Sequence, residues 1–370
     1  MLARRGALAL LVVACRAPPS TDDRPAAASL EPPAVMPHRA PQTRLGDVVQ
    51  QNAECESCHR EIADEWQASL HREAFTSREF QSAFRSEPLA FCRECHAAES
   101  PRTADPRTEA LGIACVTCHV PEGDVVLAAP REGPIAAPHP VRREPAFASP
   151  AACAGCHEFE FPDRRPVPER MQTTIAEHAR SSARDRSCAE CHMPRAADGH
   201  RTHAFAASRD AAWMRSVVAI TATRPSPERV EFTLDLDEDA VGHALPTGDL
   251  FRQIAVEALS TRRALRPIAR RQTLARHWRM LREGGLTAQT LVRDDRLGVA
   301  DDPVHVTVEL DPADFARPIR WRVRYERVQS FTAQRDDAAL VVGGFNLADG
   351  VLDTPPGTVA PETNLAVGGV

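Results

Sequence analysis

The chain has 370 residues, with 51 acidic residues against 45 basic ones, all of them Arg, and a net charge of −6. This length allows two domains. The net negative charge argues against nucleic acid as a partner, because phosphates attract basic surfaces.

The first residues have the pattern of an export signal. Arg4 and Arg5 precede a short apolar run that ends at Ala14. This run is too short to cross a bilayer as a permanent helix. The sequence therefore predicts a signal peptide over residues 1–14.

Cys15 comes directly after the apolar run and resembles the lipidated cysteine in the lipobox of bacterial lipoproteins. An ordinary cleaved leader that contains a Cys is the alternative. Residues 15–45 are rich in Pro and Ala, as expected of a tether that lifts a domain from a membrane. Because Arg16 rather than Asp follows the cysteine, the outer membrane is favoured. We therefore expect an exported, periplasmic protein with a lipid anchor on Cys15.

Five copies of the pattern Cys-x-x-Cys-His follow. In this pattern two thiols add to the vinyl groups of one porphyrin, and the next His ligates its iron. A zinc site or a disulfide framework has no reason to place His after every second Cys. The sequence therefore predicts five covalently attached haem c groups, each with a proximal His. The cysteines are Cys55, Cys58, Cys92, Cys95, Cys115, Cys118, Cys153, Cys156, Cys188 and Cys191, and the histidines are His59, His96, His119, His157 and His192.

Residues 46–212 form the predicted pentahaem domain. The span that holds the five motifs is too short to give each haem a protein core of its own, so the haems must pack against one another. Short helices are expected between the motifs, with apolar residues at helical spacing over Glu61–Phe84 and a second candidate over Glu169–Arg184.

Beyond Ala212 the apolar period changes to two, which indicates half-buried antiparallel strands. With turn signals between the runs, the sequence predicts an antiparallel β-sandwich over residues 213–350 and an irregular tail over 351–370. The fold class is therefore α+β. The alternating runs are Val230, Phe232, Leu234 and Leu236; Val304, Val306, Val308 and Leu310; and Ile319, Trp321, Val323 and Tyr325.

The remaining histidines bear on function, because a haem iron with one His is open to a ligand, whereas a second His closes it. From their settings, His71 on a predicted helix, His139 in a Pro-rich loop and His243 in an inter-strand loop are candidate distal ligands. Of the pair after the fifth motif, we prefer His203 to His200. A ligand at His243 would lock the two domains together. The others are His38 in the tether, His305 on the polar side of a strand, His277, which is left unassigned, and His178.

Several segments resemble multihaem c-type cytochromes in which a haem-rich N-terminal region precedes a β-domain, distantly similar to the group related to hydroxylamine oxidoreductase and to small tetrahaem cytochromes. The resemblance covers roughly residues 52–327. It implies distal ligand roles for His71, His139, His203 and His243. Where many relatives have Trp, this chain has His178, which is either a fifth distal ligand or a surface residue. The segments are WQASLH at Trp66, GIACVTCHV at Gly112, APHPV at Ala137, MQTTIAEH at Met171, CAECHMP at Cys188, THAF at Thr202 and GHALPTGDLFR at Gly242.

Two functions fit this pattern. The first is an electron carrier between membrane-associated redox partner proteins, working through closely packed, mostly bis-His haems. The alternative is a reductase of a small nitrogen or sulfur compound at one open haem. The chain has no Lys, so no motif ends in Lys as in pentahaem nitrite reductase. The supply of spare His favours the carrier, and no catalytic residue is assigned. A third reading makes the β-domain a docking module, which positions the carrier on its partner.

Overall fold

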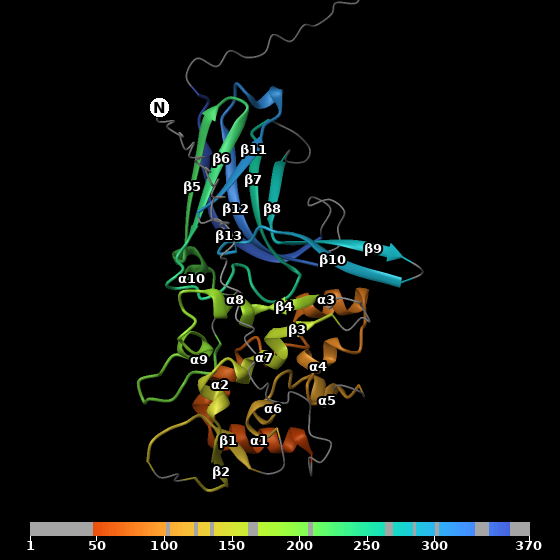
Figure 1. Cartoon of the computed structure of the whole chain (residues 1–370), viewed down its shortest axis with the longest axis vertical. Helices are drawn as coiled ribbons and strands as arrows, with labels where there is room; N and C mark the ends of the chain where they lie inside the picture. The colour runs from red at the N-terminus through yellow and green to blue at the C-terminus, as the bar shows by residue number, and fades with distance from the viewer. Residues whose placement is uncertain are drawn as a thin grey trace, which may run out of the picture. The chain divides into compact units, whose positions relative to one another are not determined.

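The computed structural model describes residues 47–100, 104–121, 125–133, 137–161, 169–205, 210–262, 269–283, 286–299, 303–329 and 340–355. The signal peptide, the tether and Cys15 lie outside the described residues, as does most of the predicted tail. The described residues confirm an α+β fold, in which a helical region precedes antiparallel sheets (Figure 1).

The helical region consists of short helices and short strands. Two strand pairs accompany the helices: β1 with β2 in parallel, and β3 with β4 antiparallel. None of the helices in the described ranges is long and apolar enough to cross a membrane. The elements are α1 Val48–Cys58, α2 Arg60–Gln67, α3 Arg78–Ser86, α4 Cys92–His96, α5 Pro106–Glu109, α6 Cys115–His119, β1 Val126–Ala128, β2 Val141–Arg143, α7 Ala151–His157, β3 Glu158–Glu160, β4 Arg170–Thr173, α8 Thr174–Arg180 and α9 Cys188–His192.

The helical pattern expected over Glu61–Phe84 forms two short helices rather than one continuous helix, because the chain breaks between α2 and α3. At the break the carbonyl of His71 accepts a hydrogen bond from Ile113 N at 2.9 Å. Gly112 permits this approach: its φ is 61°, and a Cβ there would lie 2.3 Å from the His71 oxygen. Ser77 then caps α3 by accepting from Phe80 N. Between the two helices, the backbone of His71 is therefore held by a long-range hydrogen bond to Ile113 rather than by the hydrogen bonds of one continuous helix.

The helix expected over Glu169–Arg184 is also shorter than predicted. Its first part is strand β4, which pairs with β3, and α8 begins only at Thr174. The Glu158 carboxylate accepts from Ile175 N at 3.1 Å and from Ala176 N at 3.2 Å. An acceptor from a neighbouring strand thus satisfies the first free N–H groups of α8.

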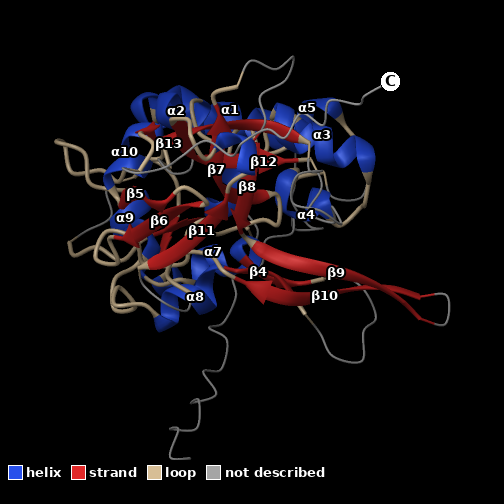
Figure 2. Ribbon diagram, turned by 90° about the horizontal axis from the view of Figure 1, so that it is seen from above, coloured by secondary structure: helices blue, strands red, loops and turns tan. Residues whose placement is uncertain are grey.

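The C-terminal region is a β-sandwich of two antiparallel sheets, in the orders β11-β6-β5 and β13-β12-β7-β8. A hairpin of β9 and β10 extends to one side, as Figure 2 shows. Helix α10, Ala211–Ser216, leads into the sandwich. The strands are β5 Val218–Ser226, β6 Arg229–Leu236, β7 Arg252–Ser260, β8 Ala269–Leu274, β9 Arg276–Glu283, β10 Leu286–Asp294, β11 Val304–Glu309, β12 Ile319–Val328 and β13 Val341–Leu352.

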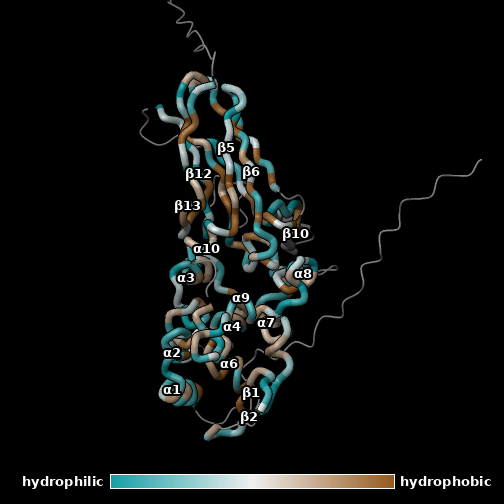
Figure 3. Tube along the Cα trace, turned by 90° about the vertical axis from the view of Figure 1, so that its left-hand side faces the viewer, coloured by the Kyte–Doolittle hydropathy of each residue, from teal (hydrophilic) through white to brown (hydrophobic). Residues whose placement is uncertain are grey.

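The sandwich core confirms the period-two pattern. Val230, Phe232 and Leu234 on β6 are at most 1 % exposed, and they pack with Val256 of β7 and Val323 of β12 from the other sheet. Apolar and polar residues alternate along these strands (Figure 3). Burying each such side chain contributes roughly 1.5–3 kcal/mol, so the sandwich is stabilised by its own side chains.

Candidate haem centres

Each Cys-x-x-Cys-His motif folds as about one helical turn. Four motifs lie within α4, α6, α7 and α9, which all end at the motif His, and the first lies at the end of α1. Residues three and four apart share one face of a helix, so both thiols and the imidazole of a motif point to the same side. All ten motif cysteines are free. The motifs therefore present thiols and imidazoles together, as attachment to one porphyrin requires.

Four of the five motif histidines face a second imidazole. Two imidazoles on opposite sides of one metal ion have ring centroids roughly 6 Å apart, because each metal–nitrogen bond is about 2 Å long. The observed separations match this distance, so each pair fits one iron between its rings. The pairs are His59 with His139 at 6.5 Å, His157 with His71 at 6.3 Å, His119 with His203 at 6.1 Å and His192 with His243 at 6.1 Å.

Backbone carbonyls orient several of these rings. His119 Nδ1 lies 2.7 Å from the carbonyl oxygen of Leu127, and His203 Nδ1 lies 2.9 Å from that of Arg201. An Nδ1–H that donates to a carbonyl leaves Nε2 with a free lone pair for a metal. The local fold thus selects the tautomer that a ligand needs.

Burial also keeps two of the candidate distal rings neutral. Together with the nearby His192 and His203, it lowers the pKa of His71 to about 4. Burial and the nearby His119 likewise lower the pKa of His203 to about 4. Only a neutral imidazole can ligate a metal, so at neutral pH both rings are in the binding form.

His96 of the second motif differs from the other four. In the described part of the chain no second imidazole faces its ring; Phe80 of α3 stacks on it instead, with centroids 3.9 Å apart. His96 Nδ1 lies 2.7 Å from the Ala74 oxygen, as expected of a proximal ligand. An iron on the other nitrogen would have protein imidazole on one side alone.

His178 and His200 were the other candidate ligands. His178 lies in α8, against Gly242, and pairs with none of the motif histidines in the described ranges. His200 is held by Asp198 at 2.5 Å and by Glu65 at 3.2 Å, so both of its ring nitrogens are engaged. The fold brings His203, rather than His200, to a motif His.

The attachment sites follow one another in space in an order that differs from the sequence. The thiol of Cys95 contacts that of Cys156, and the thiol of Cys153 contacts that of Cys188. The fourth motif therefore touches both the second and the fifth. Cys118 of the third motif also lies near the fourth. On the other side of the third motif, Cys115 lies close enough to Cys55 of the first for their charges to interact. The order is first, third, fourth, and then a branch to the second and the fifth.

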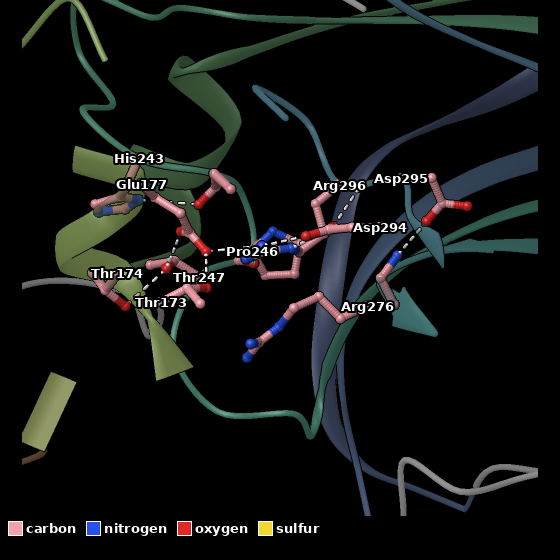
Figure 4. A network of polar contacts seen from close by, with 12 residues as sticks. Thr173, Thr174, Glu177, His243, Pro246, Thr247, Arg276, Asp294, Asp295 and Arg296 are labelled. Atoms are coloured by element: carbon pink, nitrogen blue, oxygen red, sulfur yellow. Dashed lines mark hydrogen bonds and ion pairs between the residues drawn. The ribbon is translucent and has the colours of Figure 1, made fainter. Parts of the chain in front are cut away.

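A buried polar network holds the His243 loop against α8 (Figure 4). Arg296, 4 % exposed, pairs with Glu177 at 2.8 Å and with Asp294 at 2.7 Å. Thr173 and Thr247 each donate to Glu177 at 2.6 Å. Burial raises the pKa of Glu177, but Arg296 and the two hydroxyls outweigh it, and the net pKa is lowered. None of these residues had a predicted role, although Glu177 lies in the segment MQTTIAEH and Thr247 in the segment GHALPTGDLFR.

The five helical motifs and the paired imidazoles define the class of this protein as a multihaem c-type cytochrome that binds haem c covalently. Residues 54–120, which span the first three motifs, match the family model described as cytochrome c554 and c-prime.

Among solved structures, the chain is similar to a penta-heme cytochrome c552 from Thermochromatium tepidum, with 18 % identity and a TM-score of 0.55. The match covers 80 % of this chain and 96 % of that one. At this identity the likeness concerns the fold. No curated protein sequence matches the chain.

Proposed function

We propose that this protein is a pentahaem electron carrier with four bis-His irons. The observation that carries the proposal is the set of four imidazole pairs at 6.1–6.5 Å. Haem c, once attached, supplies an iron that takes up and releases one electron. A second imidazole closes the iron to exogenous ligands and favours electron transfer over chemistry.

The protein's own residues make the carrier work in three ways. Carbonyl acceptors such as those of Leu127 and Arg201 fix the orientation of the rings. Burial lowers the pKa of His71, His203 and His243 and so keeps these rings neutral. The contacts between motifs, such as Cys95 with Cys156, hold neighbouring attachment sites close together. The spatial order supports a branched route that ends at the first, second and fifth motifs.

We further propose that the chain is exported and lipid-anchored at Cys15, and that it exchanges electrons with membrane-associated redox proteins. The signal-like segment before Cys15 and the Pro- and Ala-rich stretch after it support this assignment.

The second candidate function is a reductase of a small nitrogen or sulfur compound. The specific observation in its favour is His96, whose ring faces no second imidazole in the described part of the chain. An iron held by His96 would keep one face for a ligand. The second motif touches the fourth through Cys95 and Cys156. Electrons that enter at the first or the fifth motif would therefore reach the second motif through the fourth.

Electron paramagnetic resonance of the oxidised, fully loaded protein tests both functions. Four low-spin irons and one high-spin iron are expected, with the high-spin signal lost when Cys92 and Cys95 are both replaced by Ala, so that no haem is attached at the second motif. Five low-spin irons would exclude the reductase, and two or more high-spin irons would contradict the four closed pairs. Protein mass, measured against the apoprotein, counts the attached haems.

Membrane fractionation tests the anchor. The wild-type protein should sediment with the outer membrane, and Cys15→Ser should release it into the soluble fraction with its haem spectrum unchanged. A wild-type protein that is already soluble would contradict the lipid anchor.

A further inference from the structure

Three arginines surround one turn at the start of β7. Asp249 accepts from Arg252 Nε and Nη2, both at 3.1 Å, and pairs with Arg327 Nη2 at 3.4 Å. Arg276 Nη2 donates to the carbonyl of Gly248, the preceding residue, at 2.8 Å. Arg276 Nη2 also donates to the carbonyl of Met171 at 2.7 Å. The Asp249 carboxylate thus pairs with two of the three guanidinium groups, and only its charge acts on the third.

The other acidic groups near Arg276 do not restore the balance. Glu177 and Asp294 influence Arg276, but both are ion-paired with Arg296. The Tyr325 side chain, which lies beside Arg252, supplies a hydroxyl group and no carboxylate. The cluster of Arg252, Arg276 and Arg327 therefore holds more positive than negative charge.

Two buried N–H groups of this cluster have no acceptor among the described residues: Nη1 of Arg276 and Nε of Arg327. Arg276 is 7 % exposed, and its burial lowers its pKa to about 10. A buried cation whose N–H groups are unsatisfied costs stability unless an anion or another acceptor reaches it. The excess positive charge and these two N–H groups of the cluster are suited to binding a negatively charged oxygen atom.

Part of the cluster lies near the second motif, because the charges of Asp249, Arg327 and Arg252 act on His96. Helix α3 bridges the two parts: Phe80 stacks on His96, and Ser86 accepts from Gln329 Nε2, just beyond β12, at 2.6 Å. Arg327, near the end of β12, is therefore held close to the second motif, whose His faces no other imidazole among the described residues.

We propose that Arg252, Arg276 and Arg327 form a binding site for anionic oxygen beside the haem attached through Cys92 and Cys95. This inference rests on the proposed attachment of haem at that motif. Guanidinium groups bind carboxylates and small oxyanions through forked pairs of N–H bonds. Two sources share this chemistry: the propionate carboxylates of the haem itself, and a free anion that approaches the open iron.

The test compares Arg327→Gln with Arg327→Lys and with Arg320→Gln in the fully loaded protein. Arg320 is the matched control, because it lies on the same strand but is exposed. Two quantities are measured for the haem with the high-spin signal: its midpoint potential, and its affinity for azide as an anionic probe, with carbon monoxide as a neutral probe for the reduced iron.

If a propionate is the bound anion, Arg327→Gln lowers the midpoint potential of this haem, because a lost positive charge favours the oxidised iron, and azide affinity changes less than twofold. If the site takes a free anion, azide affinity falls about tenfold or more, since each hydrogen bond to a charged group contributes about 1.5–3 kcal/mol. Carbon monoxide binding is unchanged in both cases. In both cases Arg327→Lys, which keeps the charge but not the fork, shows a smaller effect.

The proposal is overturned if Arg327→Gln shifts neither the potential nor the azide affinity beyond the Arg320→Gln control. This outcome is distinct from a failure of the proposed function. If the wild-type protein has no high-spin iron, the open centre is wrong, but the midpoint potentials of its five haems still show whether Arg327 acts on one of them.

Discussion

The two regions of this molecule are held together in different ways. The apolar core of the sandwich draws on every one of its strands. In the described part of the haem region, the corresponding cluster of buried residues is Trp66, Leu111, Ala114 and Val116. The sandwich therefore folds around its own side chains, whereas the haem region needs the porphyrins as core material. We therefore expect the haem region to depend on haem attachment for its folding and the sandwich to fold without it.

Removal of the haems should have the largest effect. The chain made without haem attachment is expected to lose protection from amide exchange over most of residues 47–205, while β5–β8 and β11–β13 stay protected. Mass spectrometry of exchanged peptides measures this directly. Equal loss in both regions would show that the sandwich also depends on haem, and the comparison would fail.

Phe232→Ala should destabilise the sandwich by about 3–5 kcal/mol, because the side chain is 1 % exposed and leaves a cavity between the sheets. Chemical unfolding followed by circular dichroism gives the change. Val351→Ala is the control, since Val351 is 61 % exposed, and it should change stability by less than about 0.5 kcal/mol. Low-spin haem signals should persist in Phe232→Ala below its unfolding transition.

Glu177→Gln should weaken the contact between α8 and the His243 loop by about 1.5–3 kcal/mol, because a charged acceptor is lost beside Arg296. The lowered pKa of Glu177 means that its contribution is present above its ordinary pKa of 4.5 and is lost as the pH falls through the lower folded value. The wild-type protein should therefore lose more stability on acidification than the Gln variant. If the stability of the wild-type protein and of Glu177→Gln fell equally with decreasing pH, Glu177 would not stabilise this contact through its charge.

His243→Ala should convert one low-spin iron to high-spin, with little change in the stability of the sandwich. The ring of His243 lies 6.1 Å from that of His192, and the two planes differ by 6°. Electron paramagnetic resonance measures the conversion, and His305→Ala, an exposed site on β11, is the control. An unchanged spectrum would rule out His243 as a ligand.

His200→Asn should have the smallest effect. Glu65 and Asp198 raise the pKa of His200, so its contribution is fully present below the ordinary value of 6.5 and is lost as the pH rises through the folded value. The variant should lose a slight pH dependence of thermal unfolding near neutrality while the low-spin iron count stays unchanged. Loss of a low-spin iron would instead assign His200 a ligand role.

The haem-attachment motifs and the alternating strands could both be predicted from local sequence alone. The two thiols and the imidazole that bind one porphyrin are close together in the sequence. The five attachment motifs between Cys55 and His192 can therefore be recognised without a structure. Alternation on β6, β11 and β12 likewise follows from the geometry of a single strand. The pattern over Glu61–Phe84 does not form one continuous helix, because a contact between His71 and Ile113, which are far apart in the chain, outweighs local preference.

Which distal histidine lies opposite which motif histidine follows from the packing of the folded chain. The chain has 14 His, enough for five closed irons, and no count shows that His96 faces Phe80 while His178 packs on Gly242. The paired histidines lie 51 to 86 positions apart in the chain, and their pairing depends on how helices and loops pack. The arginine cluster around Asp249 could not be predicted from the sequence either. Its three arginines lie on separate strands, and their charges come close together only in the folded protein.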